Sequence, residues 1–137
     1  MKLDVVTPHG AVVTDLEATD VTLPGFLGEM GILPGHVAMM AGLGVGPMLV
    51  QTEKGPQLYA ICGGFVEVLE EKVRVLTETC ERHDQIDPEK AQAKLAKATE
   101  RLEPLSPADG ETYQVAHDSV KKHENRIKVA EEGKGLV

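Results

Sequence analysis

The spacing of apolar residues changes once along this chain, near residue 84, and that change constrains the fold more than any other feature. Before it, short segments such as DVTL (20–23) and VRVL (73–76) alternate apolar with polar residues. Alternation with a period of two is typical of strands with one buried and one solvated face, which usually pair in antiparallel sheets. Seven or more strand-like segments separated by Gly- and Pro-containing turns predict an antiparallel β-sandwich or a flattened barrel over residues 1–84.

Residues 85–137 are predicted to form two helices. Asp87 is a favourable N-cap, and Pro88 fits the first helical position, where its missing N–H costs nothing. The segment at 104–110 breaks the helical pattern, so we expect an antiparallel hairpin whose second helix begins near Glu111 and whose last residues, EGKGLV, fray. The apolar faces consist of Ala91, Leu95, Ala98 and Leu102, and of Tyr113, Ala116, Val120, Ile127 and Ala130. Faces this rich in alanine bury little area, which predicts a weakly held, switch-like hairpin.

Composition excludes several functions. The chain has 137 residues, 3% aromatic residues, no Trp and a net charge of −8, which disfavours binding to single-stranded nucleic acid. No apolar window approaches the roughly 18–20 residues that span a bilayer, and the first ten residues lack a signal or transit pattern. We therefore expect a cytosolic protein, or one that is peripheral on a membrane complex.

Neither catalysis nor metal binding is predicted. Glu29 and His36 are the best acid/base candidates, but no nucleophile or orienting group lies near them in the sequence. The five histidines lack ligand spacing, and Cys62 and Cys80 do not form a C-x-x-C pair. GLGVGP (42–47) begins as G-x-G but has Pro47 where the last glycine of a G-x-G-x-x-G phosphate-binding loop would stand. We interpret this segment as a turn.

The basic residues are concentrated in the helical part. Residues 1–84 contain 5 basic and 12 acidic residues (net −7), whereas residues 85–137 contain 9 and 10 (net −1). Four of the basic residues, here called the basic stripe, lie at i, i+4, i+7 and i+11 of the first helix: Lys90, Lys94, Lys97 and Arg101. The stripe is either a solvated face or a contact for an anionic partner, such as an acidic protein surface or a nucleotide phosphate.

The segment GEMGILPGH (28–36) combines three glycines and a proline with apolar Met30, Ile32 and Leu33. Apolar side chains on a Gly- and Pro-shaped loop favour a docking surface. The alternative is that Ile32 and Leu33 face the core.

Four motifs carry a family resemblance. GEMGILPGH (28–36), GGFVEV (63–68), VRVLTETCE (73–81) and QID (85–87) resemble the epsilon subunit of F-type ATP synthase, of the bacterial type. The resemblance implies a sandwich of about ten strands followed by a two-helix hairpin. It also implies a non-catalytic rotor subunit of the central stalk, which couples proton or sodium flow to ATP synthesis. Such a subunit lies at the cytoplasmic face of the bacterial inner membrane and contacts the membrane through the complex.

The resemblance also implies roles for particular residues. Docking to the c-subunit ring and the gamma subunit falls to Glu29, Met30, Gly31, Ile32 and His36. Gly63 and Gly64 are interpreted as backbone geometry for a tight turn or a bulge. An extended hairpin would inhibit ATP hydrolysis by placing the basic stripe against acidic residues of the catalytic beta and alpha subunits.

Some bacterial members of this family bind ATP through I/L-D-x-x-R-A, where this chain has lysine in place of the arginine. The matched positions are Glu81, Ile86, Asp87, Lys90, Ala91, Lys97 and Arg126. Lysine lacks the bidentate fork of arginine, so we expect at most weak binding of ATP as a regulatory ligand, and no required cofactor. The other hypotheses are a free-standing β-sandwich adaptor and a small ATP-sensing protein.

Overall fold

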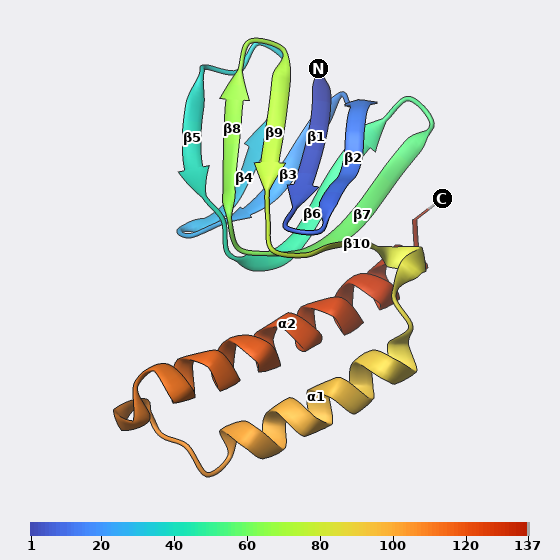
Figure 1. Cartoon of the computed structure of the whole chain (residues 1–137). Coiled ribbons are helices and arrows are strands. Elements are labelled where there is room, and N and C mark those ends of the chain that lie inside the picture. The colour runs from blue at the N-terminus through green and yellow to red at the C-terminus, as the bar shows by residue number, and fades with distance from the viewer. Residues whose placement is uncertain (137) are drawn as a thin grey trace.

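The computed structural model describes residues 1–136 and contains ten strands followed by two α-helices (Figure 1). The strands are β1 (Lys2–Thr7), β2 (Gly10–Glu17), β3 (Asp20–Gly25), β4 (Gly28–Ile32), β5 (Met39–Gly42), β6 (Val45–Thr52), β7 (Gly55–Cys62), β8 (Phe65–Leu69), β9 (Lys72–Leu76) and β10 (Cys80–Arg82). The helices are α1 (Pro88–Leu102) and α2 (Glu111–Gly133), with short 3-10 turns η1 (His83–Gln85) and η2 (Pro107–Asp109). This order confirms the predicted sandwich followed by two helices.

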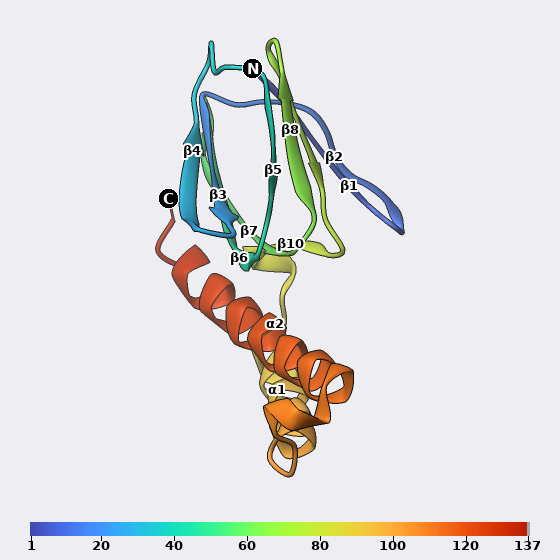
Figure 2. The same ribbon diagram turned by 90° about the vertical axis from the view of Figure 1, so that its left-hand side faces the viewer.

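The ten strands form two five-stranded sheets, in the orders β2-β1-β9-β8-β5 and β10-β7-β6-β3-β4. Figure 2 shows them as two facing layers. Neighbouring strands are antiparallel as expected, except that β1 and β9 run parallel, with Leu3 beside Val73 and Val5 beside Val75. Residue alternation does not reveal this exception, because a half-buried strand has the same period in either orientation.

The alternating residues build the core between the sheets. Val21 and Leu23 on β3, and Val73 and Val75 on β9, have no exposed surface, whereas Arg74 between the latter two is exposed. Burial of each such side chain contributes about 1.5–3 kcal/mol. The core is therefore aliphatic, as the low aromatic content requires.

Gly63 and Gly64 form the predicted tight turn before β8. Their φ angles are 68° and 98°, in the left-handed region that side chains disfavour. A Cβ at Gly64 would also overlap the carbonyl of Leu76. The backbone interpretation of these two glycines is therefore confirmed.

The hairpin lies along one end of the sandwich, with α2 between the strands and α1 (Figures 1 and 2). Asp87 caps α1 as expected, its Oδ1 accepting from the N–H groups of Glu89 (3.0 Å) and Lys90 (3.3 Å). Ala91, Ala98, Ala116 and Ala130 are the buried residues of the expected apolar faces. Neither helix is long and apolar enough to cross a membrane.

The end of α2 differs from the prediction of fraying. The helix continues through Gly133, which is buried against His83. Leu136 packs partly against an apolar cluster between the hairpin and the sandwich, and Val137, the last residue of the predicted frayed segment, lies outside the described residues. A methyl group at Gly133 would overlap the ring of His83, so the missing side chain is what lets the helix approach the sandwich. A glycine near a chain end resembles a helix breaker in sequence, which explains the error.

Candidate functional site

Large apolar side chains are exposed along one edge of the sandwich, where β4 and β5 are the outermost strands of the two sheets. Figure 2 views the molecule from this edge. Five side chains, each at least 61% exposed, form what we call the docking edge: Phe26, Leu27, Leu33, Val37 and Met40. A groove of about 580 Å³ runs between the β3–β4 turn and β5, lined by Gly25, Phe26, Leu27, Gly28, Glu29, Met30, Ala41 and Gly42. Concentrated exposure of this kind is typical of an interaction surface.

The predicted docking residues of β4 alternate between the two faces of their strand. Glu29 and Gly31 are exposed, while Met30 is half-buried opposite Leu23. Ile32 has no exposed surface and packs in the core, so the expectation that it touches a partner is wrong. The cause is the two-residue period of the strand, which turns Met30 and Ile32 inward.

His36 follows in the β4–β5 connection and is half-buried. Its backbone N–H donates to the Leu33 carbonyl (3.1 Å), and its Nδ1 lies 2.8 Å from the Val37 carbonyl oxygen. Among the hydrogen bonds and ion pairs of residues 1–136, none joins His36 to Glu29. The two residues are thus arranged as separate surface groups and do not form an acid/base pair.

Sequence reasoning missed most of the docking edge. Phe26 and Leu27 occupy the tip of the β3–β4 turn, between Gly25 and Gly28. The signal was available, because two large apolar residues at a glycine-flanked turn have no core to enter. Val37, in the irregular β4–β5 connection, and Met40, in the four-residue strand β5, carried no comparable signal, since exposed and buried apolar residues look alike in such short segments.

The hairpin packs on the sandwich through a second, smaller apolar cluster. Leu58 and Ala60 on β7 belong to the same buried cluster as residues of both helices. The buried partners from the hairpin and the segment before it are Ile86, Ala91, Val129 and Ala130. Four of these six residues are alanine or valine, so the cluster contributes modest hydrophobic stabilisation.

A buried amide complements this cluster. Asn125 on α2 is 9% exposed, and its Nδ2 donates to the Gly46 carbonyl (2.9 Å) and lies 3.5 Å from the Ile61 carbonyl. A buried amide is stabilising only when it is hydrogen-bonded, so this contact requires α2 to sit in one position.

Three polar residues form what we call the clasp: Glu81, His123 and Arg126. Arg126 donates a bidentate pair of hydrogen bonds to the Glu81 carboxylate, from Nε to Oε1 at 2.8 Å and from Nη2 to Oε2 at 3.2 Å. Its Nη1 lies 3.2 Å from His123 Nδ1. Burial, together with the positive charges of Arg126, Lys122 and Lys94, lowers the pKa of His123, and Glu81 opposes the shift. A neutral His123 therefore accepts a hydrogen bond from Arg126.

Comparison with known proteins identifies the family. The β-sandwich domain model of the ATP synthase delta/epsilon chain matches residues 1–83. The ATP synthase epsilon chain of Geotalea uraniireducens is 37% identical over 130 residues, covering 95% of this chain and 93% of its own. Epsilon chain 2 of Syntrophotalea carbinolica is 40% identical over 135 residues, covering 97% and 95%. The chain belongs to the ATP synthase epsilon chain family. A member of this family is a non-catalytic rotor subunit, and the catalytic sites lie elsewhere in the complex.

Solved structures share the epsilon-chain fold. A chain of the Euglena gracilis mitochondrial ATP synthase aligns with a TM-score of 0.77 at 23% identity, covering 98% of this chain and 80% of its own. A chain from the central stalk and c-ring of the Tetrahymena thermophila mitochondrial enzyme gives 0.56 at 11% identity, covering 97% and 95%. The sandwich and hairpin are thus retained at low identity.

The candidate nucleotide residues of this epsilon-family chain fall into separate groups. Glu81 and Arg126 pair with each other, while Ile86 and Ala91 are buried in the hairpin cluster. The carboxylate of Asp87 caps α1 by accepting hydrogen bonds from its first backbone N–H groups. The basic stripe (Lys90, Lys94, Lys97 and Arg101) is exposed on α1 and makes no ion pair within 4.0 Å in residues 1–136. The structure therefore leaves the stripe available to a partner.

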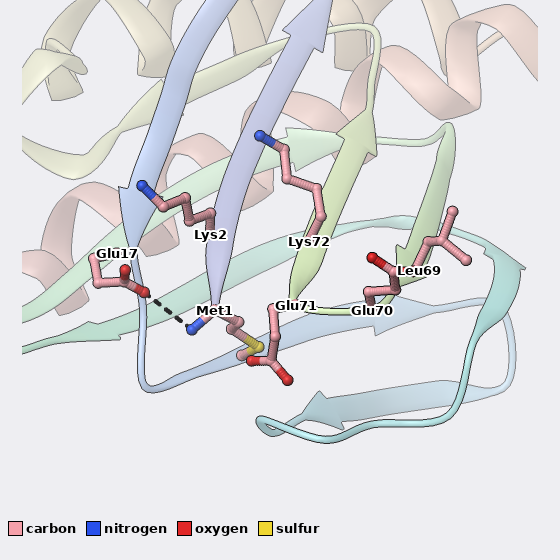
Figure 3. Close-up of a pocket in the computed structure, with 7 residues that line it drawn as sticks. All are labelled: Met1, Lys2, Glu17, Leu69, Glu70, Glu71 and Lys72. Carbon is pink, nitrogen blue, oxygen red and sulfur yellow. Dashed lines mark hydrogen bonds and ion pairs between the residues drawn. The ribbon is translucent and has the colours of Figure 1, made fainter.

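A hollow of about 450 Å³ lies where β8 turns into β9 (Figure 3). Two of its cations are already paired: the N-terminal ammonium lies 3.0 Å from Glu17, and Lys72 bridges Asp4 and Asp15. The described residues hold no group of three or more His, Cys, Asp or Glu arranged for a metal ion. We assign no chemistry to this hollow.

Proposed function

We propose that this rotor subunit attaches to its neighbours through the docking edge and regulates the synthase through its hairpin. The observation that carries the first part is the exposure of five large apolar side chains along the edge that β4 and β5 form. Burying a side chain such as Leu27 or Phe26 against a partner contributes about 1.5–3 kcal/mol each. Such an edge suits a stable attachment that has to transmit torque.

The docking edge has two ends, which suit two partners. We propose that Glu29, Met30 and Gly31 face the ring of c subunits, and that His36 lies near the gamma subunit. Ile32 is omitted, because its side chain is enclosed by the core. Attachment to the ring places the chain at the cytoplasmic face of the bacterial inner membrane, held there through the complex.

The docking proposal is tested with an ATP synthase head and stalk depleted of its own epsilon chain. We expect Leu27→Asp to weaken rebinding about tenfold or more, because a carboxylate replaces a buried anchor. Val12→Asp is the matched control: Val12 is 43% exposed on β2, at the opposite edge of the same sheet as β5. Equal affinities for both variants would refute the assignment of the docking edge.

For the hairpin, we propose that the basic stripe contacts acidic residues of the catalytic beta and alpha subunits and inhibits ATP hydrolysis. The exposure of all four cations on α1 supports this role. Lys94→Glu combined with Arg101→Glu should raise the hydrolysis rate of the reconstituted enzyme. Lys54→Glu combined with Lys134→Glu makes the same charge change at exposed positions outside the stripe. An unchanged rate in the first pair, or an equal rise in the second, would count against the proposal.

A weaker ligand role involves ATP. We propose that ATP is a weak regulatory ligand, which competes with Glu81 for Arg126 and contacts Lys90 and Lys97 as single point charges. Calorimetry with ATP and Mg²⁺ tests this. A binding heat in the wild type that is lost in Arg126→Ala would support the site. The absence of any binding heat at about millimolar ATP would refute it.

A further inference from the structure

We propose that the clasp is a pH sensor, and that protonation of His123 loosens the hairpin from the sandwich. The inference extends the switching role proposed for the hairpin by naming what biases it. Its physical basis is the triad formed by Glu81 on β10 and by His123 and Arg126 on α2, which joins the hairpin to the last strand.

The contact between Arg126 and His123 depends on protonation. Arg126 Nη1 carries hydrogens, so at 3.2 Å the His123 Nδ1 must be the acceptor. A protonated imidazole has a hydrogen on both ring nitrogens and cannot accept. Protonation thus replaces a hydrogen bond with two cations in contact. The repulsion acts on the Arg126 guanidinium and weakens its contact with Glu81.

The surroundings of His123 also disfavour its charge. The titratable and charged groups around it are Lys122 and Arg126 on α2, Lys94 on α1, Glu81 on β10, and the groups of an adjoining hollow, namely Cys62, Glu78 and Asp118. Glu81 already shares its carboxylate with Arg126, so it opposes the effect of Arg126, Lys122 and Lys94 on His123 only in part. Burial and these cations together lower the pKa of His123.

The direction of the pH effect follows from this pKa. Once the hairpin leaves the sandwich, His123 meets solvent and its pKa returns to about 6.5. The docked state therefore binds fewer protons than the undocked state, so docking is strongest above that value and weakens as the pH falls towards the lower docked pKa. Each unit of pKa lowering changes the docking equilibrium about tenfold.

Loosening the clasp also bears on the inhibitory role. The undocked hairpin is the form that can extend and present the basic stripe to the catalytic subunits. Acidification would then favour the form that restrains ATP hydrolysis. The sensor itself requires no other subunit, because all three clasp residues belong to this chain.

NMR of the full chain tests the sensor directly. The imidazole resonances of His123 report its pKa, and the Asn125 side-chain NH₂, which donates to the sandwich, reports docking. Between about pH 8 and pH 5.5 we expect His123 to titrate below 6.5 and the docked Asn125 signal to decline over the same range. A His123 that titrates at or above 6.5 would overturn the proposal.

Variants separate the sensor from a general effect of acid. His123→Gln keeps an acceptor that cannot be protonated, so the docked signal should persist at about pH 5.5, whereas His123→Lys should lose it even at about pH 8. His117→Gln, on the same helix, should behave like the wild type. Acid-induced loss that survives in His123→Gln would refute the sensor. Because the isolated chain is used, this result is independent of whether the hairpin inhibits hydrolysis.

Discussion

Replacing Asn125 by alanine removes the one buried side-chain amide that joins α2 to the sandwich in the described residues. In the docked state the Gly46 carbonyl, which lies opposite Ile61 in the β6–β7 ladder, would face an apolar methyl group in place of the Asn125 amide. Once the hairpin is undocked, water can hydrogen-bond the same carbonyl. The substitution should therefore act on docking and leave the folding of the sandwich unaffected.

The magnitude follows from the geometry. The bond to Gly46 at 2.9 Å is fully formed, while the 3.5 Å approach to Ile61 contributes little. Losing one buried hydrogen bond costs about 0.5–1.5 kcal/mol net, which corresponds to a fall in the docking constant of about 2- to 12-fold. Alanine also favours helix over asparagine by up to about 0.7 kcal/mol, but this gain acts on docked and undocked α2 alike and cancels.

The assay is methyl NMR of Leu58, Ala60 and Val129, whose side chains meet in the hairpin cluster. Their shifts and exchange broadening give the undocked population of wild type and variant. Gln114→Ala is the matched control, because this amide is exposed on the same helix and donates to Asp118 within it (2.8 Å).

Two outcomes would refute the reasoning. An undocked population that is unchanged by Asn125→Ala would mean that the buried amide does not hold the hairpin. An equal rise with Gln114→Ala would mean that any amide on α2 matters, through helix stability and not through the contact with the sandwich.

Three further predictions concern single sites. Gly133→Ala should undock the hairpin although it favours helix by about 1 kcal/mol, because its methyl group overlaps the ring of His83; circular dichroism would then show retained helix while the methyl shifts report undocking. Burial raises the pKa of Cys80 to about 12, so iodoacetamide at about pH 8 should modify this thiol in guanidinium and spare it in the folded chain, and rapid native labelling would contradict its burial. Gly64→Ala should lower the free energy of unfolding by about 1–3 kcal/mol in urea titration, because φ is 98° and a Cβ overlaps the carbonyl of Leu76; a neutral result would disprove the strain.

The sequence predicted the sandwich well because each strand buries one face, which leaves an alternation of apolar and polar residues. Val21 and Leu23 alternate with polar neighbours, and the structure buries both fully. The start of α1 was equally predictable, since the N-cap role of Asp87 and the fit of Pro88 to the first helical turn depend only on local backbone geometry. What alternation could not specify is which strands become neighbours, and the parallel pairing of β1 with β9 was missed for that reason.

The candidate sites were less predictable from sequence. Ile32 was assigned to the docking surface because its glycine-rich setting resembles a loop, yet the segment is strand β4 and the residue faces inward. Asn125 and Gly133 gave no signal, because a polar residue and a glycine on a helix ordinarily face solvent or end it. They are buried because α2 is covered on two sides, by α1 and by the sandwich, and helical periodicity from one sequence indicates a single covered face.

The parallel pairing of β1 with β9 has a consequence for biosynthesis. Strand β1 is synthesised first, but its parallel partner β9 (Lys72–Leu76) follows about seventy residues later. The sheet therefore cannot be completed until most of the sandwich has left the ribosome. Contacts so distant in sequence are slow to form, whereas the hairpin, built from local contacts, folds quickly once it is made. Until β9 arrives, β1 presents an unpaired edge to other nascent chains. We therefore expect premature termination within β8 to yield an aggregating product, and termination after β10 to yield a soluble one.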